Sequence, residues 1–268
     1  MNWFDLTDEV AVVIGGGGTL GGAIAHGFAE AGAKVAVLDF VEEAGRRRVE
    51  ELRQKGATAE FFQVNALEKP SLEAAREGVE QALGAPTILL NAAGGNDPRT
   101  TVTPENPFEN IPLENWHRNF DLNLVGGALL PCQVFGPGMV ARRKGSIINI
   151  ASVSAHVPLS RVVAYSAAKA AVLSLTRFLA REWAPHGVRV NSITPGFFPA
   201  AQNRKLLFNE DGTPTDRTRA IWNHTPMGRF GEPHELVGAA LFLASEKASS
   251  FVTGADIRVD GGFLAQTI

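Results

Sequence analysis

The sequence predicts an α/β fold with one doubly wound parallel sheet of about seven strands and helices on both faces. Short β-branched runs alternate along the chain with segments of helical periodicity. The chain has 268 residues, of which 45% are hydrophobic and 20% charged, enough apolar material for one large core. Strands that alternate with helices in this way are typical of parallel sheets covered on both faces. We therefore expect a single domain over residues 1–268.

Each expected strand is a short β-branched run that is followed by a helical pattern or closes the chain. The strands are expected at residues 9–14, 34–39, 60–64, 87–91, 146–150, 188–193 and 256–259. Helices, in which apolar residues recur every three or four positions, are expected at residues 20–31, 42–55, 71–83, 116–140, 164–183 and 233–244. Gly32 and Gly56 follow the first two helices and predict where they end.

Two long connections interrupt this alternation, at residues 94–113 and 196–232. Both follow expected strand ends, and the carboxyl ends of the strands are where open α/β sheets bind ligands. Loops of this length in a compact domain are usually lids or binding loops. We expect the second connection to be the substrate loop.

Composition excludes several classes of protein. A net charge of −3 and a pI near 6.1 argue against nucleic-acid binding. The single cysteine, Cys132, excludes an intrachain disulfide and a cysteine-based zinc site, and we expect no metal. The first residues lack the basic segment of a signal peptide, and no apolar stretch approaches the roughly 18 residues of a membrane span. We expect a cytoplasmic protein that acts on a small molecule.

A glycine-rich turn joins the first expected strand to the first expected helix. Gly16, Gly18 and Gly21 have the G-x-G-x-x-G spacing, in the strand-then-helix context that the motif requires. Glycines let backbone N–H groups approach a pyrophosphate, which then lies at the positive helix N-terminus. The turn therefore favours a Rossmann-like dinucleotide site over a merely flexible turn.

Asp39 ends the second expected strand, about 20 residues after the glycine turn. An acid at that offset can bind both ribose hydroxyls of NAD and repel the 2′-phosphate of NADP; a helix N-cap or a solvated loop acid is the alternative. Arg46, Arg47 and Arg48 could meet such a phosphate, but they alternate with glutamates and are better explained as a salt-bridged helix surface. The pattern favours NAD(H) over NADP(H).

Tyr165 is the only tyrosine, and Lys169 lies four residues later on the same predicted helix face. The ammonium can then lower the phenol pKa, as a phenol needs in order to act as a base near neutral pH. Ser152 follows the expected strand 146–150 and can hydrogen-bond a substrate oxygen at the same sheet edge. Alone, a Tyr-x-x-x-Lys pair is common and usually has no catalytic meaning.

Eight segments in order extend this pattern over most of the chain. They are VVIGGGGTLGGAIA (12–25), VLD (37–39), LLNAAG (89–94), DLNLVG (121–126), IINIAS (147–152), YSAAK (165–169), RVNSITPG (189–196) and VTGADIRVDGGF (252–263). From about Leu6 to Phe263 the chain thus resembles the short-chain dehydrogenase/reductase family. The resemblance implies an NAD(P)-dependent oxidoreductase that acts on CH–OH groups, assembled as a homotetramer.

The resemblance also implies a catalytic tetrad of Asn123, Ser152, Tyr165 and Lys169. In the family, the tyrosine is the general acid in reduction and the general base in oxidation, while the serine holds the substrate oxygen. The lysine binds the nicotinamide ribose and lowers the tyrosine pKa, and the asparagine backbone holds a water that links the lysine to solvent.

Further positions correspond to the family's cofactor site. The implied cofactor-binding residues are Gly15, Gly18, Thr19, Leu20, Gly21, Asp39, Asn65, Asn91, Gly94, Tyr165, Lys169, Pro195, Gly196 and Phe198. Some of them depart from the family pattern: Thr19 replaces a glycine, and Asn65 replaces an adenine-contacting aspartate. Ala200 replaces a threonine near the nicotinamide amide, where Thr194 or backbone groups could substitute. We expect a changed loop conformation rather than lost binding.

Segments 94–98, 121–135, 195–218 and 224–233 resemble a narrower group within this family, the D-mannonate oxidoreductases (fructuronate reductases), which interconvert D-fructuronate and D-mannonate. A sugar acid needs a cation for its carboxylate and amide or hydroxyl partners for its hydroxyls. The expected substrate-binding residues are Asn96, Ser152, His156, Gln202, Asn203 and Arg204. Arg204 is the expected carboxylate ligand, because its guanidinium can bind bidentately.

Other functions stay open. A gluconate 5-dehydrogenase-like enzyme for sugar acids or polyols is the nearest alternative. A 3-oxoacyl-carrier-protein reductase is less favoured, because acidic carrier proteins prefer a basic docking surface that the charge balance does not suggest. A non-catalytic NAD(H)-sensing scaffold would have no need of Ser152, Tyr165 and Lys169, which are all present.

Overall fold

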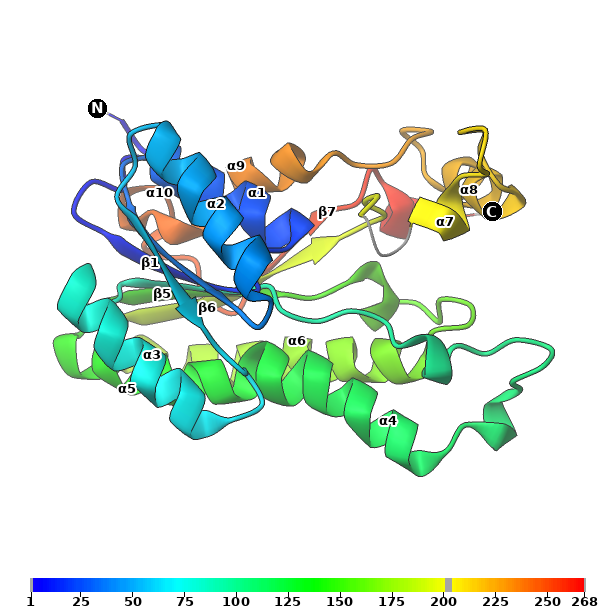
Figure 1. Ribbon diagram of the computed structural model, residues 1–268, viewed down its shortest axis with the longest axis horizontal. Helices are drawn as coiled ribbons and strands as arrows, with labels where there is room; N and C mark the ends of the chain where they lie inside the picture. Colours follow the sequence, from blue (N-terminus) through cyan, green and yellow to red (C-terminus); the bar gives the residue numbers. More distant parts are fainter. Residues whose placement is uncertain (1, 201–203, 268) are drawn as a thin grey trace.

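The structure, a computed structural model, describes residues 2–200 and 204–267. Its centre is a seven-stranded sheet in the order β3-β2-β1-β4-β5-β6-β7, in which every neighbouring pair is parallel (Figure 1). The strands are β1 (Val10–Ile14), β2 (Lys34–Asp39), β3 (Ala59–Gln63), β4 (Ile88–Asn91), β5 (Gly145–Ile150), β6 (Val188–Pro195) and β7 (Asp256–Val259). The predicted α/β fold with about seven parallel strands is confirmed, while the single-domain assignment stays a prediction.

Helices cover both faces of this sheet (Figure 1). One face carries α1 (Thr19–Glu30), α2 (Glu42–Gln54), α9 (Val237–Ala244) and α10 (Glu246–Ser249). The other carries α3 (Lys69–Ala82), α4 (Leu113–Phe120), the π-helical stretch η3 (Asp121–Leu129), α5 (Leu130–Arg142) and α6 (Val163–Trp183). Two short helices, α7 (Arg204–Leu207) and α8 (Asp216–His224), lie beyond the carboxyl end of β6 (Figure 1).

The core consists of two layers, one on each face of the sheet, because successive side chains of a strand point to opposite faces. Val13 of β1 packs in the layer that includes Phe28 of α1, whereas Val12 packs in the layer that includes Phe135 of α5. Every residue of β1 and β6 is buried. The apolar run of β1 is typical of a strand covered on both faces, whereas β6 also buries polar side chains, among them Asn191 and Thr194.

The segment from Leu113 to Arg142 is one continuous helix that begins earlier than the predicted residues 116–140. By length and composition this helix could cross a membrane, and among the described residues it is the only helix that meets this criterion. Half of its most apolar window is buried, and it packs against α3 and α6. Its apolar character is therefore explained by the core of the protein.

The connection at residues 196–232 contains two helices that the sequence analysis did not predict. Thr215 caps α8 by accepting a hydrogen bond from the N–H of Thr218 at 3.3 Å. Ile221 of α8, Leu207 of α7 and Phe230 form a small separate core. The described part of this connection is therefore packed around its own apolar cluster, and its role as the substrate loop stays a prediction.

The turn between β1 and α1 lies against the turn after β4 with no room for side chains. Gly15 has a φ of +78°, and a Cβ on it would lie 2.8 Å from the Cα of Ala93. A Cβ on Gly21 would collide with the Gly15 carbonyl oxygen. Gly18, the N-cap of α1, offers no side-chain cap, so the first N–H groups of the helix are left to other partners.

We predict that Gly21→Ala destabilises the protein by about 1–3 kcal/mol, because a methyl group must displace backbone in a closely packed turn. Gly238→Ala is the matched control in α9: a Cβ at that exposed position meets nothing within 4 Å. Alanine there should stabilise the protein by up to about 1 kcal/mol through helix propensity. Thermal or urea denaturation of both variants measures the difference, and equal stabilities would contradict this description of the turn.

Candidate active site

The four residues of the expected tetrad come from three elements that meet at the carboxyl edge of β4 and β5. Asn123 lies in η3, Ser152 follows β5, and Tyr165 and Lys169 lie in the first two turns of α6. Buried amides brace these elements. Asn149 of β5 donates through Nδ2 to Thr176 Oγ1 of α6 at 2.9 Å, and its Oδ1 accepts from Asn91 Nδ2 of β4 at 2.8 Å. The site is therefore held by the packed part of the fold.

Lys169 is an almost fully buried lysine, 3% exposed. Its Nζ donates to the Ile150 carbonyl at 2.9 Å and lies 5.8 Å from the centroid of the Tyr165 ring. Burial lowers the lysine pKa to about 8, and no carboxylate among residues 2–200 and 204–267 counteracts that shift. Near neutral pH this side chain is poised to gain or lose a proton.

Tyr165 is hydrogen-bonded to Ser152, whose Oγ also accepts from the N–H of Ser154 at 3.2 Å. Burial raises the pKa of the Tyr165 phenol, and the hydrogen bond with Ser152 partly offsets the increase. The expectation that Lys169 lowers this pKa is wrong for the protein by itself, because desolvation dominates. The phenol is thus held in its protonated form at neutral pH.

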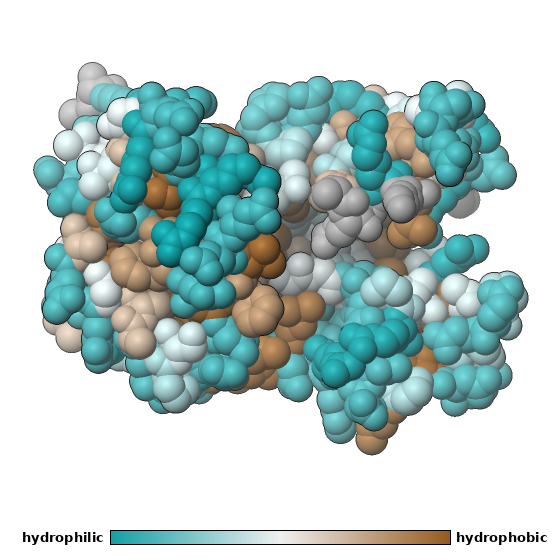
Figure 2. Space-filling model, in the orientation of Figure 1, coloured by the Kyte–Doolittle hydropathy of each residue, from teal (hydrophilic) through white to brown (hydrophobic). Residues whose placement is uncertain are grey.

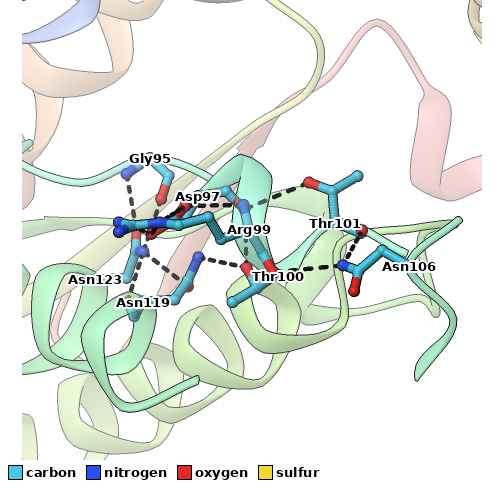
Figure 3. A network of polar contacts seen from close by, with 8 residues as sticks. All are labelled: Gly95, Asp97, Arg99, Thr100, Thr101, Asn106, Asn119 and Asn123. Carbon is cyan, nitrogen blue, oxygen red and sulfur yellow. Dashed lines mark hydrogen bonds and ion pairs between the residues drawn. The ribbon is translucent and has the colours of Figure 1, made fainter. Parts of the chain in front are cut away.

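Asn123 contributes its side chain as well as its backbone. Its amide is fully buried: Nδ2 donates to the Gly95 carbonyl at 2.8 Å, and Oδ1 accepts from the Gly95 N–H at 2.9 Å (Figure 3). Gly94 has a φ of +140°, and a Cβ on it would lie 2.6 Å from Asn123 Oδ1 and 3.4 Å from Lys169 Nζ. The turn after β4 therefore passes over the tetrad as bare backbone.

A polar network extends from Asn123 into the loop that follows β4 (Figure 3). Asn119, one helical turn earlier, donates to Thr100 Oγ1 at 3.1 Å, and both residues are fully buried. Asn96, an expected substrate ligand, donates to Thr101 Oγ1 at 2.8 Å. The sequence analysis missed Asn119 and Thr100; the spacing of Asn119 and Asn123 on one helix face was the only available signal.

Asp39 closes the glycine turn. One carboxylate oxygen accepts from the Gly17 N–H and the other from the Val41 N–H, both at 2.9 Å. Asp39 thus ties the glycine turn to the segment before α2. It is not a helix N-cap, because Val41 is the N-cap of α2 and has no side-chain cap, and its contact with a ribose stays a prediction. Arg46 pairs with Glu42 and Arg48 with Glu51, which confirms the salt-bridged surface of α2.

The other expected cofactor residues lie along the same edge. Thr19 and Leu20 open α1, and Asn65 turns the chain after β3 by donating to Glu68 at 2.8 Å. The Asn91 side chain is buried within the sheet, so only its backbone can face a ligand. Pro195 ends β6, and the segment of Gly196 and Phe198 continues from it; Phe198 is buried.

Two expected substrate residues have partners within the protein. His156 Nε2 lies 3.2 Å from an Asp256 carboxylate oxygen and 3.3 Å from the Thr194 hydroxyl, which itself donates to Asp256 at 2.8 Å. Arg204 is exposed at the start of α7, with its guanidinium 5.5 Å from the Phe208 ring centroid. Gln202 and Asn203 lie outside the described residues.

Comparisons with known proteins extend the likeness over nearly the whole chain. The family model described as "Enoyl-(Acyl carrier protein) reductase" matches residues 17–264. The uncharacterized oxidoreductase UxuB of Bacillus subtilis is 41% identical over 269 residues, covering 97% of this chain and 96% of the relative.

Two solved structures share the fold. A candidate D-mannonate oxidoreductase from Haemophilus influenza with bound NAD is 39% identical, with a TM-score of 0.93 over 98% of this chain and 97% of that chain. A gluconate 5-dehydrogenase from Burkholderia cenocepacia in complex with NADP and tartrate is 33% identical, with a TM-score of 0.88 over 99% and 98%.

Identities of 33–41% over such lengths go beyond a shared fold and define an oxidoreductase acting on CH–OH groups. Within that class, the chain belongs to the short-chain dehydrogenase/reductase family. The family expected from the eight sequence segments is confirmed.

The burial of Lys169 predicts a pH-dependent stability difference in the cofactor-free protein. Between about pH 8 and 10.5 the native lysine has lost its proton while the unfolded lysine keeps it, so stability gains from rising pH. Lys169→Met lacks this gain. The difference in unfolding free energy between wild type and variant should therefore grow by about 1–3 kcal/mol in favour of wild type between pH 7 and 10.5.

Urea denaturation at several pH values measures this difference. Lys34→Met is the control, because exposed Lys34 also donates to a backbone carbonyl, that of Leu83 at 3.2 Å. A difference between Lys169→Met and wild type that stays constant from pH 7 to 10.5 would show that Lys169 is not desolvated.

Proposed function

We propose that the protein is an NAD(H)-dependent reductase of a keto sugar acid, converting D-fructuronate to D-mannonate and the reverse. The observation that carries the proposal is that Ser152, Tyr165 and Lys169 meet beyond the carboxyl end of β5, with Lys169 Nζ 5.8 Å from the Tyr165 ring centroid, next to a turn that accepts only bare backbone. The substrate class is supported by the likeness to the candidate D-mannonate oxidoreductase and to the gluconate 5-dehydrogenase.

The glycine turn fits a dinucleotide. Side chains are excluded at Gly15, Gly17 and Gly21, and the uncapped start of α1 offers backbone N–H groups to a pyrophosphate. Asp39 would bind the adenosine ribose, and Lys169 and Tyr165 the nicotinamide ribose. When bound, the nicotinamide supplies or accepts the hydride.

The protein's own residues then handle the proton. Ser152 holds the substrate oxygen by a hydrogen bond, and Tyr165, kept protonated by burial, donates its proton to that oxygen during reduction. Lys169, with a pKa of about 8, can return a proton to the phenol. Asn123 keeps the turn after β4 in place and, through its backbone, would hold the water that links Lys169 to solvent.

The preference for NAD(H) rests on Asp39, whose carboxylate would repel a 2′-phosphate. The arginines of α2 do not offset it, because Arg46 and Arg48 are paired with glutamates. Bound NAD in the D-mannonate oxidoreductase structure supports this choice, whereas NADP in the gluconate 5-dehydrogenase shows that both cofactors occur among relatives.

We also propose that the protein is a cytoplasmic homotetramer. Exposed apolar side chains on the helices of the tetrad face support an assembly, among them Leu113, Leu122 and Phe178. The second candidate function is a gluconate 5-dehydrogenase-like activity, which the likeness to such an enzyme favours.

NADH oxidation at 340 nm tests the function with D-fructuronate, D-tagaturonate, 5-ketogluconate and an acetoacetyl thioester, each repeated with NADPH. We expect the highest kcat/KM for D-fructuronate with NADH, and at least tenfold less with NADPH, about 1.4 kcal/mol of discrimination. Preference for another keto acid would overturn the substrate, and silence on all of them with NADH bound would favour the sensing scaffold.

A further inference from the structure

We propose that Arg217, with Arg161 beside it, forms the subsite that binds the substrate carboxylate. The inference rests on the proposed function, because it assigns the acid group of a keto sugar acid. It differs from the sequence-based choice of Arg204.

Arg217 lies in the first turn of α8, and the backbone there is fixed. Thr218, fully buried, donates its hydroxyl hydrogen to the Leu207 carbonyl, and Thr215 caps the helix. Asp216 and Arg219 pair with each other at 2.8 Å on the exposed side of the helix. Arg217 is partly buried instead, and it has no hydrogen-bond or ion-pair partner within residues 2–200 and 204–267.

Arg161 brings a second positive charge to the same place. Burial lowers the pKa of the Arg217 guanidinium, and the charge of Arg161 lowers it further. The Arg161 backbone is held in a left-handed conformation, φ +74°, while its carbonyl accepts from the Val102 N–H at 2.8 Å. Arg161 is exposed and Arg217 is half-buried without an ion-pair partner among the described residues, so a bound anion would reduce the repulsion between the two guanidinium groups.

Arg161 connects the proposed subsite to the elements that carry the expected reacting groups. Arg161 lies four residues before Tyr165, at the entry to α6, and Val102 belongs to the loop that Asn123 and Asn119 brace. The surface is hollowed between the part that carries α7 and α8 and the part that carries α4 (Figure 2). A hexuronate carries its ketone and carboxylate near opposite ends, so a ketone at Ser152 leaves the carboxylate free to reach α8.

Arg204 is less suited to this role. It is exposed on a four-residue helix, and its guanidinium lies over the Phe208 ring. An ion pair at an exposed site contributes little, whereas a partly desolvated guanidinium binds a carboxylate more strongly through its fork of donors.

The experiment compares Arg217→Gln, Arg217→Lys and Arg204→Gln, with Arg219→Gln as the control on the same helix. Steady-state kinetics are measured with D-fructuronate and with the neutral ketose D-fructose. We expect Arg217→Gln to raise KM for the acid by about 10- to 100-fold with little change in kcat, and to leave the neutral ketose unaffected. Arg217→Lys should recover part of the loss, and Arg219→Gln should stay near wild type.

An unchanged KM in Arg217→Gln, equal losses for both substrates, or a loss confined to Arg204→Gln would overturn the subsite. Size-exclusion chromatography accompanies the kinetics, because a change of assembly would place Arg217 in a subunit contact instead.

If wild type reduces no keto acid, calorimetry with D-mannonate and NAD separates the two proposals. Binding that Arg217→Gln abolishes would support the subsite while the proposed reaction fails; no binding to wild type would overturn both.

Discussion

Backbone-to-backbone contact at the carboxyl edge of β1 and β4 is the constraint on which the site depends. Gly15 lies against Ala93, and Gly94 lies against the Asn123 amide, so no side chain fits at either glycine. Where side chains are excluded, backbone N–H groups become available to a ligand of the size of a dinucleotide. The same contacts hold the turn after β4 close to Lys169 of α6.

Burial then sets the proton affinities of Lys169 and Tyr165 in the proposed tetrad. Lys169 and Tyr165 share a desolvated site without an acid, so burial disfavours the ammonium and the phenolate alike. A phenol that keeps its proton, next to a lysine with a pKa of about 8, is suited to proton donation near neutral pH.

The sheet and the tetrad could be predicted from the sequence because both depend on local patterns. Short β-branched runs marked the seven strands, and the eight segments that resemble the short-chain dehydrogenase/reductase family marked Ser152, Tyr165 and Lys169 as the candidate site. Helix α8 could not be predicted, because its stability comes from packing against Leu207 and Phe230, which no periodicity in the segment reveals. The pairing of Asn119 with Thr100 likewise depends on tertiary contact. The choice between Arg204 and Arg217 at the substrate end also depends on burial, which a sequence does not show.

The central claim is that Tyr165 transfers the proton, and Tyr165→Phe tests it most directly. The substitution removes only the hydroxyl of the single tyrosine in the sequence. NADH binding, followed by cofactor fluorescence, should stay within about twofold of wild type, while turnover of D-fructuronate, or of whichever keto acid the wild type reduces, falls by about 10²- to 10⁴-fold. Turnover within a few-fold of wild type would contradict the account.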